Sequence, residues 1–171
     1  PKGVGGLVIR KRDGISLPIK PLMYGGGQER GVRPGTLPVA LIAGMAKSLE
    51  ISIKNQDKWD SECKEIKSMA LDAFKGIQYK VYGTTDQNTL PNTLSIAFAD
   101  LDAEAVILML KEHAEISTGS ACTSDSYTPS HVISSMGASR DEAQRVVRFS
   151  WGKETNPDVF KSIATLLQPL L

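Results

Sequence analysis

Cys122 is the residue whose surroundings best suit covalent chemistry. It lies in the run STGSACTS (117–124), and the small and polar side chains of Gly119–Tyr127 predict an exposed loop around it. An exposed thiol can act as a nucleophile when a nearby cation or helix N-terminus favours its thiolate form. The other cysteine, Cys63, falls in an apolar stripe with Trp59 and Ile66 at helical spacing, which predicts a buried structural side chain.

Arg148 and the glycine-rich stretch Gly25–Thr36 could bind anions. Arg148 interrupts the apolar run Val146–Ser150, so its guanidinium either faces solvent or meets an anionic ligand. Gly25–Thr36 holds five glycines, two arginines and a threonine hydroxyl directly before a predicted helix, where Thr36 is a good N-cap. Backbone N–H groups at such a place can contact phosphate. The spacing matches neither the dinucleotide-binding fingerprint nor the Walker loop, so an irregular connection between sheet and helix is the alternative.

The histidines and the composition narrow the possible chemistry. His113 lies near the end of a predicted helix, and His131 follows Cys122 by nine residues and could orient or deprotonate a group. Two cysteines and two histidines are too scattered for a metal site.

With 20 basic and 19 acidic side chains, the chain has no charge pattern typical of nucleic-acid or membrane-surface binding. The few cysteines indicate a reducing compartment, so we expect a cytoplasmic protein.

The first half of the chain predicts one long helix after irregular structure. Val4–Arg10 predicts a short apolar strand and Ile15–Met23 a second extended segment. Tyr24–Pro38 predicts a stretch without regular structure. Leu37–Lys75 then predicts a helix with two apolar stripes. The stripes change phase near residues 55–57, where we expect a bend or break.

The second half predicts a small α/β layer in which strands and helices alternate. The expected strands are Tyr79–Tyr82, Asn92–Ala99, Glu115–Thr118 and Val146–Ser150. The expected helices are Asp102–Ala114 and three shorter ones that begin at Thr128-Pro129, Ser139 and Asn156-Pro157. Asp102 should cap its helix, Ser139 and Glu142 should form a capping box, and Gly137 should end the helix before it.

Three motifs in order, GGGQERGVRPGTLP, STGSACTS and VRFSWG, resemble the C-terminal half of a cysteine desulfurase. These enzymes are fold type I pyridoxal-phosphate (PLP) proteins that take sulfur from L-cysteine and release L-alanine. The resemblance implies that Cys122 attacks the substrate sulfur and becomes a persulfide, and that Arg148 clamps the substrate carboxylate. It also implies that Thr36 reaches the cofactor phosphate in the neighbouring subunit of a homodimer. The loop around Cys122 resembles the long-loop group, which serves iron–sulfur cluster and related sulfur-transfer pathways.

The resemblance also implies a domain organisation. The Schiff-base lysine of the family precedes a Gly-Pro-Lys-Gly segment, and this chain begins at Pro1-Lys2-Gly3, so that lysine is expected upstream of Pro1. We therefore expect a C-terminal fragment that is inactive alone. In this reading, residues 1–36 are the tail of the PLP-binding large domain, 37–75 form a bent interdomain helix, and 76–171 form a small C-terminal α/β domain with the Cys122 loop.

The leading hypothesis is a PLP-dependent cysteine desulfurase whose persulfide sulfur passes to an acceptor or iron–sulfur scaffold protein. For this enzyme we expect no metal site and no nucleic-acid or membrane partner. A second hypothesis is a free-standing persulfide carrier or regulatory domain without PLP. A third is a cysteine hydrolase that uses Cys122 with His131, although nothing like a triad order supports it.

Overall fold

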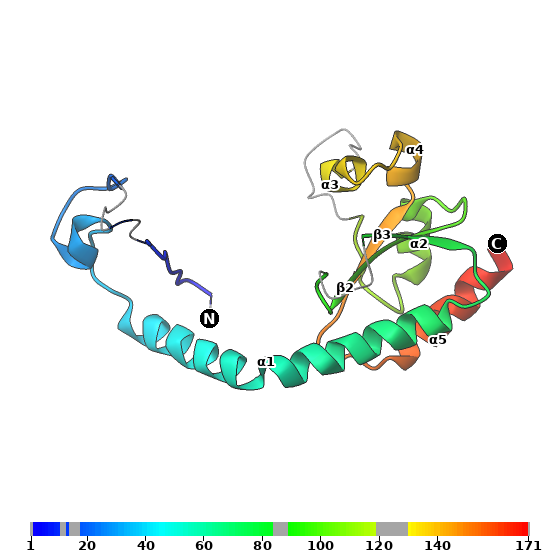
Figure 1. Ribbon diagram of the computed structural model, residues 1–171, viewed down its shortest axis with the longest axis horizontal. Helices are drawn as coiled ribbons and strands as arrows, with labels where there is room; N and C mark the ends of the chain where they lie inside the picture. The colour runs from blue at the N-terminus through cyan, green and yellow to red at the C-terminus, as the bar shows by residue number, and fades with distance from the viewer. Residues whose placement is uncertain (1, 11–12, 14–17, 84–88, 119–129, 171) are drawn as a thin grey trace. The chain divides into compact units, whose positions relative to one another are not determined.

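The chain forms two compact units, Pro1–Gln56 and Asp57–Leu171, each of which is described by itself (Figure 1). The computed structural model describes residues 2–10, 13, 18–83, 89–118 and 130–170. The division falls within helix α1 (Val39–Ala73), near the point where the two apolar stripes of the sequence change phase. The helix is assigned continuously through residues 55–57, so the alternative of a break there is wrong. None of the helices in the described ranges is both long and apolar enough to span a bilayer.

The first unit contains little regular structure besides the N-terminal half of α1. Among its described residues no strand forms, so the extended segment predicted over Val4–Arg10 is not a β-strand. The physical reason is that no other described segment pairs with it, and its side chains are exposed, with Val8 at 93%. The same holds for the described part of Ile15–Met23, where Leu22 is 99% exposed. A strand pattern predicts a strand only where a partner is available.

The sequence predicts no regular structure in the glycine-rich stretch, but the stretch contains one short helix. Gln28–Gly31 forms a short 3-10 helix, η1, in which Glu29 and Arg30 have left-handed φ angles of 49° and 58°. Gly31 follows with a φ of 76°, which glycine adopts at little cost. The chain therefore reverses direction within a few residues, and two non-glycine residues carry the strain of that reversal.

The second unit is built on a three-stranded antiparallel sheet in the order β1-β2-β3. Its strands are β1 (Tyr79–Tyr82), β2 (Thr93–Phe98) and β3 (Val146–Ser150), which confirms three of the predicted strands. The fourth, Glu115–Thr118, is reduced to a single bridge between Ser117 and Arg148 on the outer side of β3.

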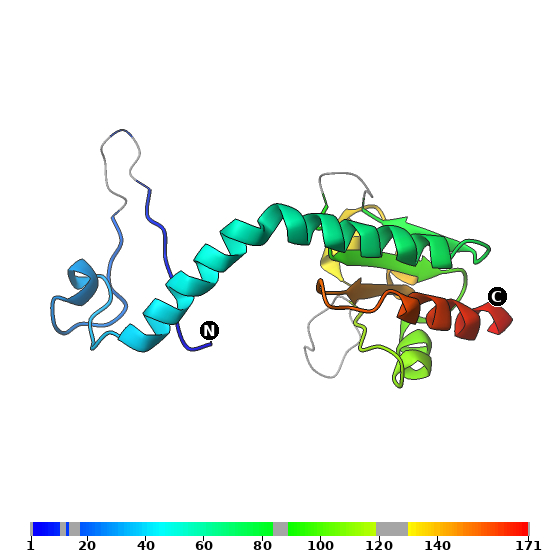
Figure 2. The same cartoon turned by 90° about the horizontal axis from the view of Figure 1, so that it is seen from below.

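Helices cover both faces of this sheet (Figure 1). On one face pack the C-terminal half of α1, α2 (Ala103–Leu110) and α5 (Asp158–Leu167), and Figure 2 shows α5 beside α1 there. On the other face lie α3 (His131–Ser135) and α4 (Arg140–Ala143), over a smaller apolar cluster. A short 3-10 helix, η2 (Gln168–Leu170), follows α5. The predicted small α/β layer is therefore present, with antiparallel strands.

The larger core is organised around Phe74, which follows α1 and is fully buried. Its ring lies 5.0 Å from that of Phe98 in β2, and 6.1 Å from those of both Phe149 in β3 and Phe160 in α5. The edge-to-face geometry with Phe98 and Phe160 is favourable for aromatic pairs. One side chain thus joins α1, two strands and α5.

The caps expected from the sequence are present. The Asp102 carboxylate accepts hydrogen bonds from the backbone N–H groups of Glu104 and Ala105, and Ser139 and Glu142 form a capping box. Gly137 follows α3 with a φ of 91°. Helix α2 ends at Leu110 instead of the predicted Ala114. The residues after it form a turn, in which the His113 N–H donates to the Leu110 carbonyl three residues back.

Replacing Phe74 with alanine should destabilise the second unit strongly. The change leaves a cavity at the centre of the aromatic cluster, and such substitutions cost about 3–5 kcal/mol. The measurement is urea unfolding followed by the fluorescence of buried Trp151. Leu108→Ala is the matched control, because that side chain is 73% exposed and should change stability little. Equal effects of the two substitutions would contradict the described core.

Candidate active site

Arg148 lies in the middle of β3 and points away from the larger core. Its neighbours Val147 and Phe149 are buried in that core, while Arg148 itself is exposed. Its backbone is held by Ser117, since the Arg148 N–H donates to the Ser117 carbonyl at 2.5 Å and the Ser117 N–H donates to the Arg148 carbonyl at 3.2 Å. The guanidinium makes no hydrogen bond or ion pair with any residue that the structure describes. The backbone of Arg148 is therefore fixed, and no described residue neutralises its guanidinium.

Cys122 lies outside the described residues, as does the predicted loop Gly119–Tyr127 around it. The residues that flank 119–129 are described, however. On one side Thr118 follows Ser117, which pairs with Arg148. On the other side Ser130 is buried and precedes α3, whose Ile133 packs on the sheet face that also carries Arg148. Both ends of the segment that contains Cys122 are thus attached at this face.

Thr36 lies in the first unit and is exposed. The expectation that it caps α1 is wrong, because the helix starts at Val39, whose N–H is taken by the Leu37 carbonyl at 2.9 Å. The Thr36 hydroxyl makes no hydrogen bond to a described residue and can donate to a ligand. Of the two arginines nearby, Arg33 is committed to the Pro34 carbonyl at 2.7 Å, whereas Arg30 makes no contact of this kind within the described ranges.

The predicted site residues fall into different units. Thr36 belongs to the first unit and Arg148 to the second, so the surroundings of each residue are described within its own unit. His131 is the first residue of α3 and is exposed, so it belongs to the helix that follows the Cys122 segment. Among the described residues no group of three or more histidine, cysteine, aspartate or glutamate side chains could hold a metal ion.

Cys63 is buried in the larger core, as predicted. Burial raises the pKa of its thiol, and the carboxylates of Glu62 and Asp60 add to the rise. A thiol that stays protonated and buried is a poor nucleophile. Its backbone carbonyl instead accepts a hydrogen bond from the Trp151 indole N–H at 3.1 Å, which ties α1 to the end of β3.

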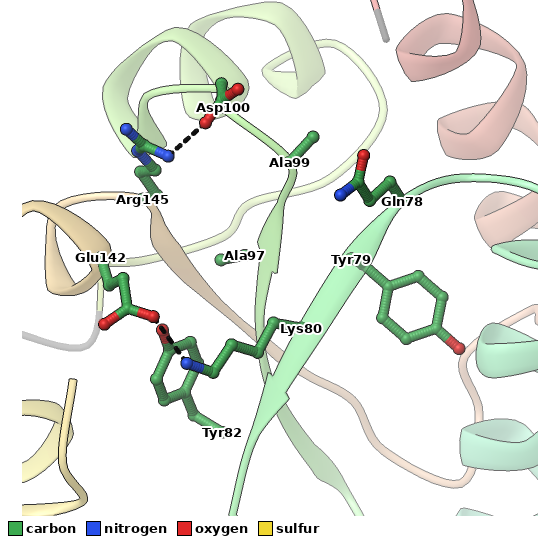
Figure 3. A pocket seen from close by; sticks show the side chains of 9 residues that line it. All are labelled: Gln78, Tyr79, Lys80, Tyr82, Ala97, Ala99, Asp100, Glu142 and Arg145. Carbon is green, nitrogen blue, oxygen red and sulfur yellow. Dashed lines mark hydrogen bonds and ion pairs between the residues drawn. The ribbon is translucent and has the colours of Figure 1, made fainter.

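A shallow pocket of about 200 Å³ lies beside β1 and was not predicted from the sequence (Figure 3). Lys80 of β1 and Glu142 of α4 form an ion pair at 2.6 Å across it, and Arg145 pairs with Asp100. Each cation therefore already has a carboxylate partner, and the pocket offers no unpaired charge to a ligand. The alternation of β1 places Lys80 on the α4 side, but the ion pairs depend on a strand order that local patterns do not reveal.

Comparison with known proteins identifies the family. A family model described as aminotransferase class-V matches residues 1–158. The chain belongs to this family. Curated relatives include cysteine desulfurase IscS of Rickettsia bellii, 40% identical over 157 residues, which cover 91% of this chain and 37% of the relative. The enzyme of the same name from Vibrio vulnificus strain YJ016 is 36% identical over 159 residues, which cover 92% of this chain and 38% of the relative.

Solved structures agree with this assignment. A NifS-like protein matches with a TM-score of 0.74 over 93% of this chain and 40% of its own, at 24% identity, which supports the fold alone. DndA from Streptomyces lividans is 39% identical, with a TM-score of 0.62 over 81% of this chain and 38% of its own. The predicted resemblance to cysteine desulfurases and the predicted fold class are confirmed. The chain spans less than two fifths of the length of the curated relatives it matches.

The first unit fits one part of a PLP site. The Thr36 hydroxyl and the Arg30 guanidinium are donors without a hydrogen-bond or ion-pair partner in the described part of the chain, and both lie in the glycine-rich stretch. Hydroxyl and guanidinium groups are typical ligands of a phosphate. These residues can therefore hold the phosphate group of the cofactor that the family implies.

The acid stability of the second unit should depend on Glu142. A hydrogen bond from Lys80, together with those from Ser139, lowers the pKa of Glu142 from 4.5 to about 2. A lowered pKa contributes stability that is present above pH 4.5 and is lost as the pH falls through about 2. In Glu142→Gln, the free energy of unfolding measured with urea should therefore fall less as the pH is lowered from 4.5 to about 2. Glu104→Gln is the control, an exposed carboxylate in the first turn of α2. If the free energy of unfolding of Glu142→Gln fell with pH as steeply as that of the original protein, this assignment would be contradicted.

Proposed function

We propose that the chain is the C-terminal part of a cysteine desulfurase, which transfers sulfur from L-cysteine to Cys122 and releases L-alanine. The observation that carries the proposal is the guanidinium of Arg148, which has no partner among the described residues. Its backbone is fixed beside Ser117, just before the segment that contains Cys122. Arg148 and Cys122 lie on neighbouring parts of the chain. The cation matches the carboxylate of L-cysteine, and the nucleophile matches its sulfur. The names of the curated relatives support the same activity.

Arg148 binds the substrate carboxylate in this proposal. A planar guanidinium can donate two parallel hydrogen bonds to a carboxylate, which fixes the orientation of the amino acid as well as its position. No described residue competes for the guanidinium, so binding breaks no existing ion pair. With the carboxylate held, the side chain of L-cysteine has a defined direction toward the nucleophile.

Cys122 acts as the nucleophile. Its thiolate attacks the sulfur of L-cysteine, so that a sulfur–sulfur bond forms and the carbon–sulfur bond of the substrate breaks. The electron pair of the broken bond stays with carbon, which takes up a proton and becomes the methyl group of L-alanine. Cys122 is oxidised to a persulfide and the substrate carbon is reduced, so no external oxidant is needed. When bound, PLP supplies the electron sink for this chemistry.

The remaining parts of the proposal concern assembly and the fate of the sulfur. Thr36, with Arg30, contacts the PLP phosphate in the neighbouring subunit of a homodimer, and the lysine that binds the cofactor lies upstream of Pro1. The persulfide sulfur passes to an acceptor or an iron–sulfur scaffold protein in the cytoplasm. The resemblance of the motif around Cys122 to the long-loop group supports the iron–sulfur acceptor.

Cys122→Ser should abolish persulfide formation in the complete enzyme, meaning this chain continuous with the upstream part of the class-V domain. The hydroxyl cannot accept the substrate sulfur, so alanine release from L-cysteine should fall to background. Alanine and persulfide are measured separately, the latter by mass spectrometry of the protein. The 171-residue chain with added PLP should give neither product.

Cys63→Ala is the matched control for that experiment. Because Cys63 is buried in the core, its loss should cost roughly 1 kcal/mol of stability and leave persulfide formation intact. Sulfur transfer that persists in Cys122→Ser but not in Cys63→Ala would assign the nucleophile to Cys63. Persulfide formation without PLP would instead favour a carrier domain.

Arg148→Ala should raise the KM for L-cysteine in the complete enzyme by roughly ten- to a hundredfold, the range of a charge-assisted contact to carboxylate. Arg148→Lys should restore little, because an ammonium lacks the planar pair of donors. Cysteamine, which has no carboxylate, provides the comparison and should be nearly unaffected. An equal loss with both thiols would mean that Arg148 supports the strand and not the substrate.

A further inference from the structure

The register of the sheet places Ser95 directly opposite Arg148. Residues of neighbouring antiparallel strands that are Cα partners project from the same face, and Ser95 of β2 is the partner of Arg148 in β3. Ser117 is its partner on the other side. Arg148 therefore lies in a row between two serines.

Ser95 is the closer of these two neighbours by backbone geometry. The N–H and C=O of Arg148 both bond to Ser117, so they point away from β2. In an antiparallel sheet, this makes the Arg148–Ser95 pair a non-hydrogen-bonded one, in which the side chains approach most closely, with Cβ atoms about 4.5–5.5 Å apart. A group that lies over Ser95 is therefore within reach of the guanidinium.

The Ser95 hydroxyl is available for a ligand. It is partly buried and makes no hydrogen bond with any residue in the described ranges. The other residues around Arg148 on this face are short, and none is acidic. They are Thr93 and Ala97 in β2, and Val146 and Ser150 in β3. An anion that enters here meets one cation and the small or hydroxyl-bearing side chains of β2 and β3, with Tyr82 of β1 on the other side of Ser95. Neither β2 nor β3 carries a carboxylate that would repel it.

We propose that Ser95 is a second contact for the substrate carboxylate and determines specificity for it. This inference rests on the proposed desulfurase function. The short side chain leaves room for the carboxylate above β2, and its hydroxyl donates a hydrogen bond to one carboxylate oxygen while Arg148 binds the group from β3. A longer apolar side chain at this position would occupy the place of the carboxylate.

The test compares three substitutions at position 95 in the complete enzyme. Ser95→Ala should raise the KM for L-cysteine roughly three- to tenfold with little change in kcat, as expected for one lost hydrogen bond. Ser95→Thr keeps the hydroxyl and should stay closer to the original enzyme. Ser95→Leu should impair L-cysteine more than Ser95→Ala does, and cysteamine should be much less affected by either substitution. Ser68→Ala, an exposed serine on α1, is the control.

Binding of the product L-alanine, measured by calorimetry, separates this inference from the proposed function. Weaker binding in Ser95→Ala, with ethylamine unaffected, supports the carboxylate contact even if the enzyme makes no persulfide. An active enzyme whose KM for L-cysteine and affinity for L-alanine are unchanged in Ser95→Ala overturns the inference and leaves the proposed function standing. Equal losses with L-cysteine and cysteamine also overturn it, because they indicate a role in the sheet alone.

Discussion

The alternation of side chains along β3 is the constraint on which the candidate site depends. Val147 and Phe149 must face the larger core, because their burial joins the sheet to the aromatic cluster around Phe74. With a strand period of two, Arg148 between them can only face the other side. The packing that stabilises the unit therefore also fixes the direction of the Arg148 side chain. A slip of one residue in register would bury the arginine and expose two core side chains.

Helix α1 holds this register from the larger-core side. The Trp151 indole donates to the Cys63 carbonyl just after β3, and the Lys67 amine donates to the Leu90 carbonyl before β2. Cys63 and Lys67 are one helical turn apart, so a single face of α1 contacts both chain segments at the same end of the sheet. Burial lowers the pKa of the Lys67 amine, which is the cost of this anchor. Because these contacts lie near the ends where β2 and β3 pair, they limit sliding between Ser95 and Arg148.

Local signals in the sequence were sufficient for most of the second unit. The strands Tyr79–Tyr82 and Val146–Ser150 and the caps at Asp102 and Ser139 were predictable, because each depends on residues a few positions apart. Local signals failed at Val4–Arg10, whose apolar run has no described partner strand, and at Thr36, which does not cap α1. The sequence also indicated which residues could act as a nucleophile or bind an anion. The pairing of Arg148 with Ser95 was not, since it depends on the register between strands far apart in sequence.

The two units would meet the demands of the proposed binding sites in different ways. In the second unit, the side chains around Arg148 are fixed by a buried sheet, so the proposed ligand would encounter a preorganised surface. In the first unit, Pro34 is the only buried residue of the described ones, and Glu29 and Arg30 adopt left-handed conformations that cost of order 1–3 kcal/mol each. Few contacts among the described residues hold these two residues against that strain. A phosphate bound by Thr36 and Arg30 would offset part of it through charge-assisted hydrogen bonds. Within the described residues the glycine-rich stretch is therefore held by few contacts, whereas the sheet around Arg148 is packed on both faces.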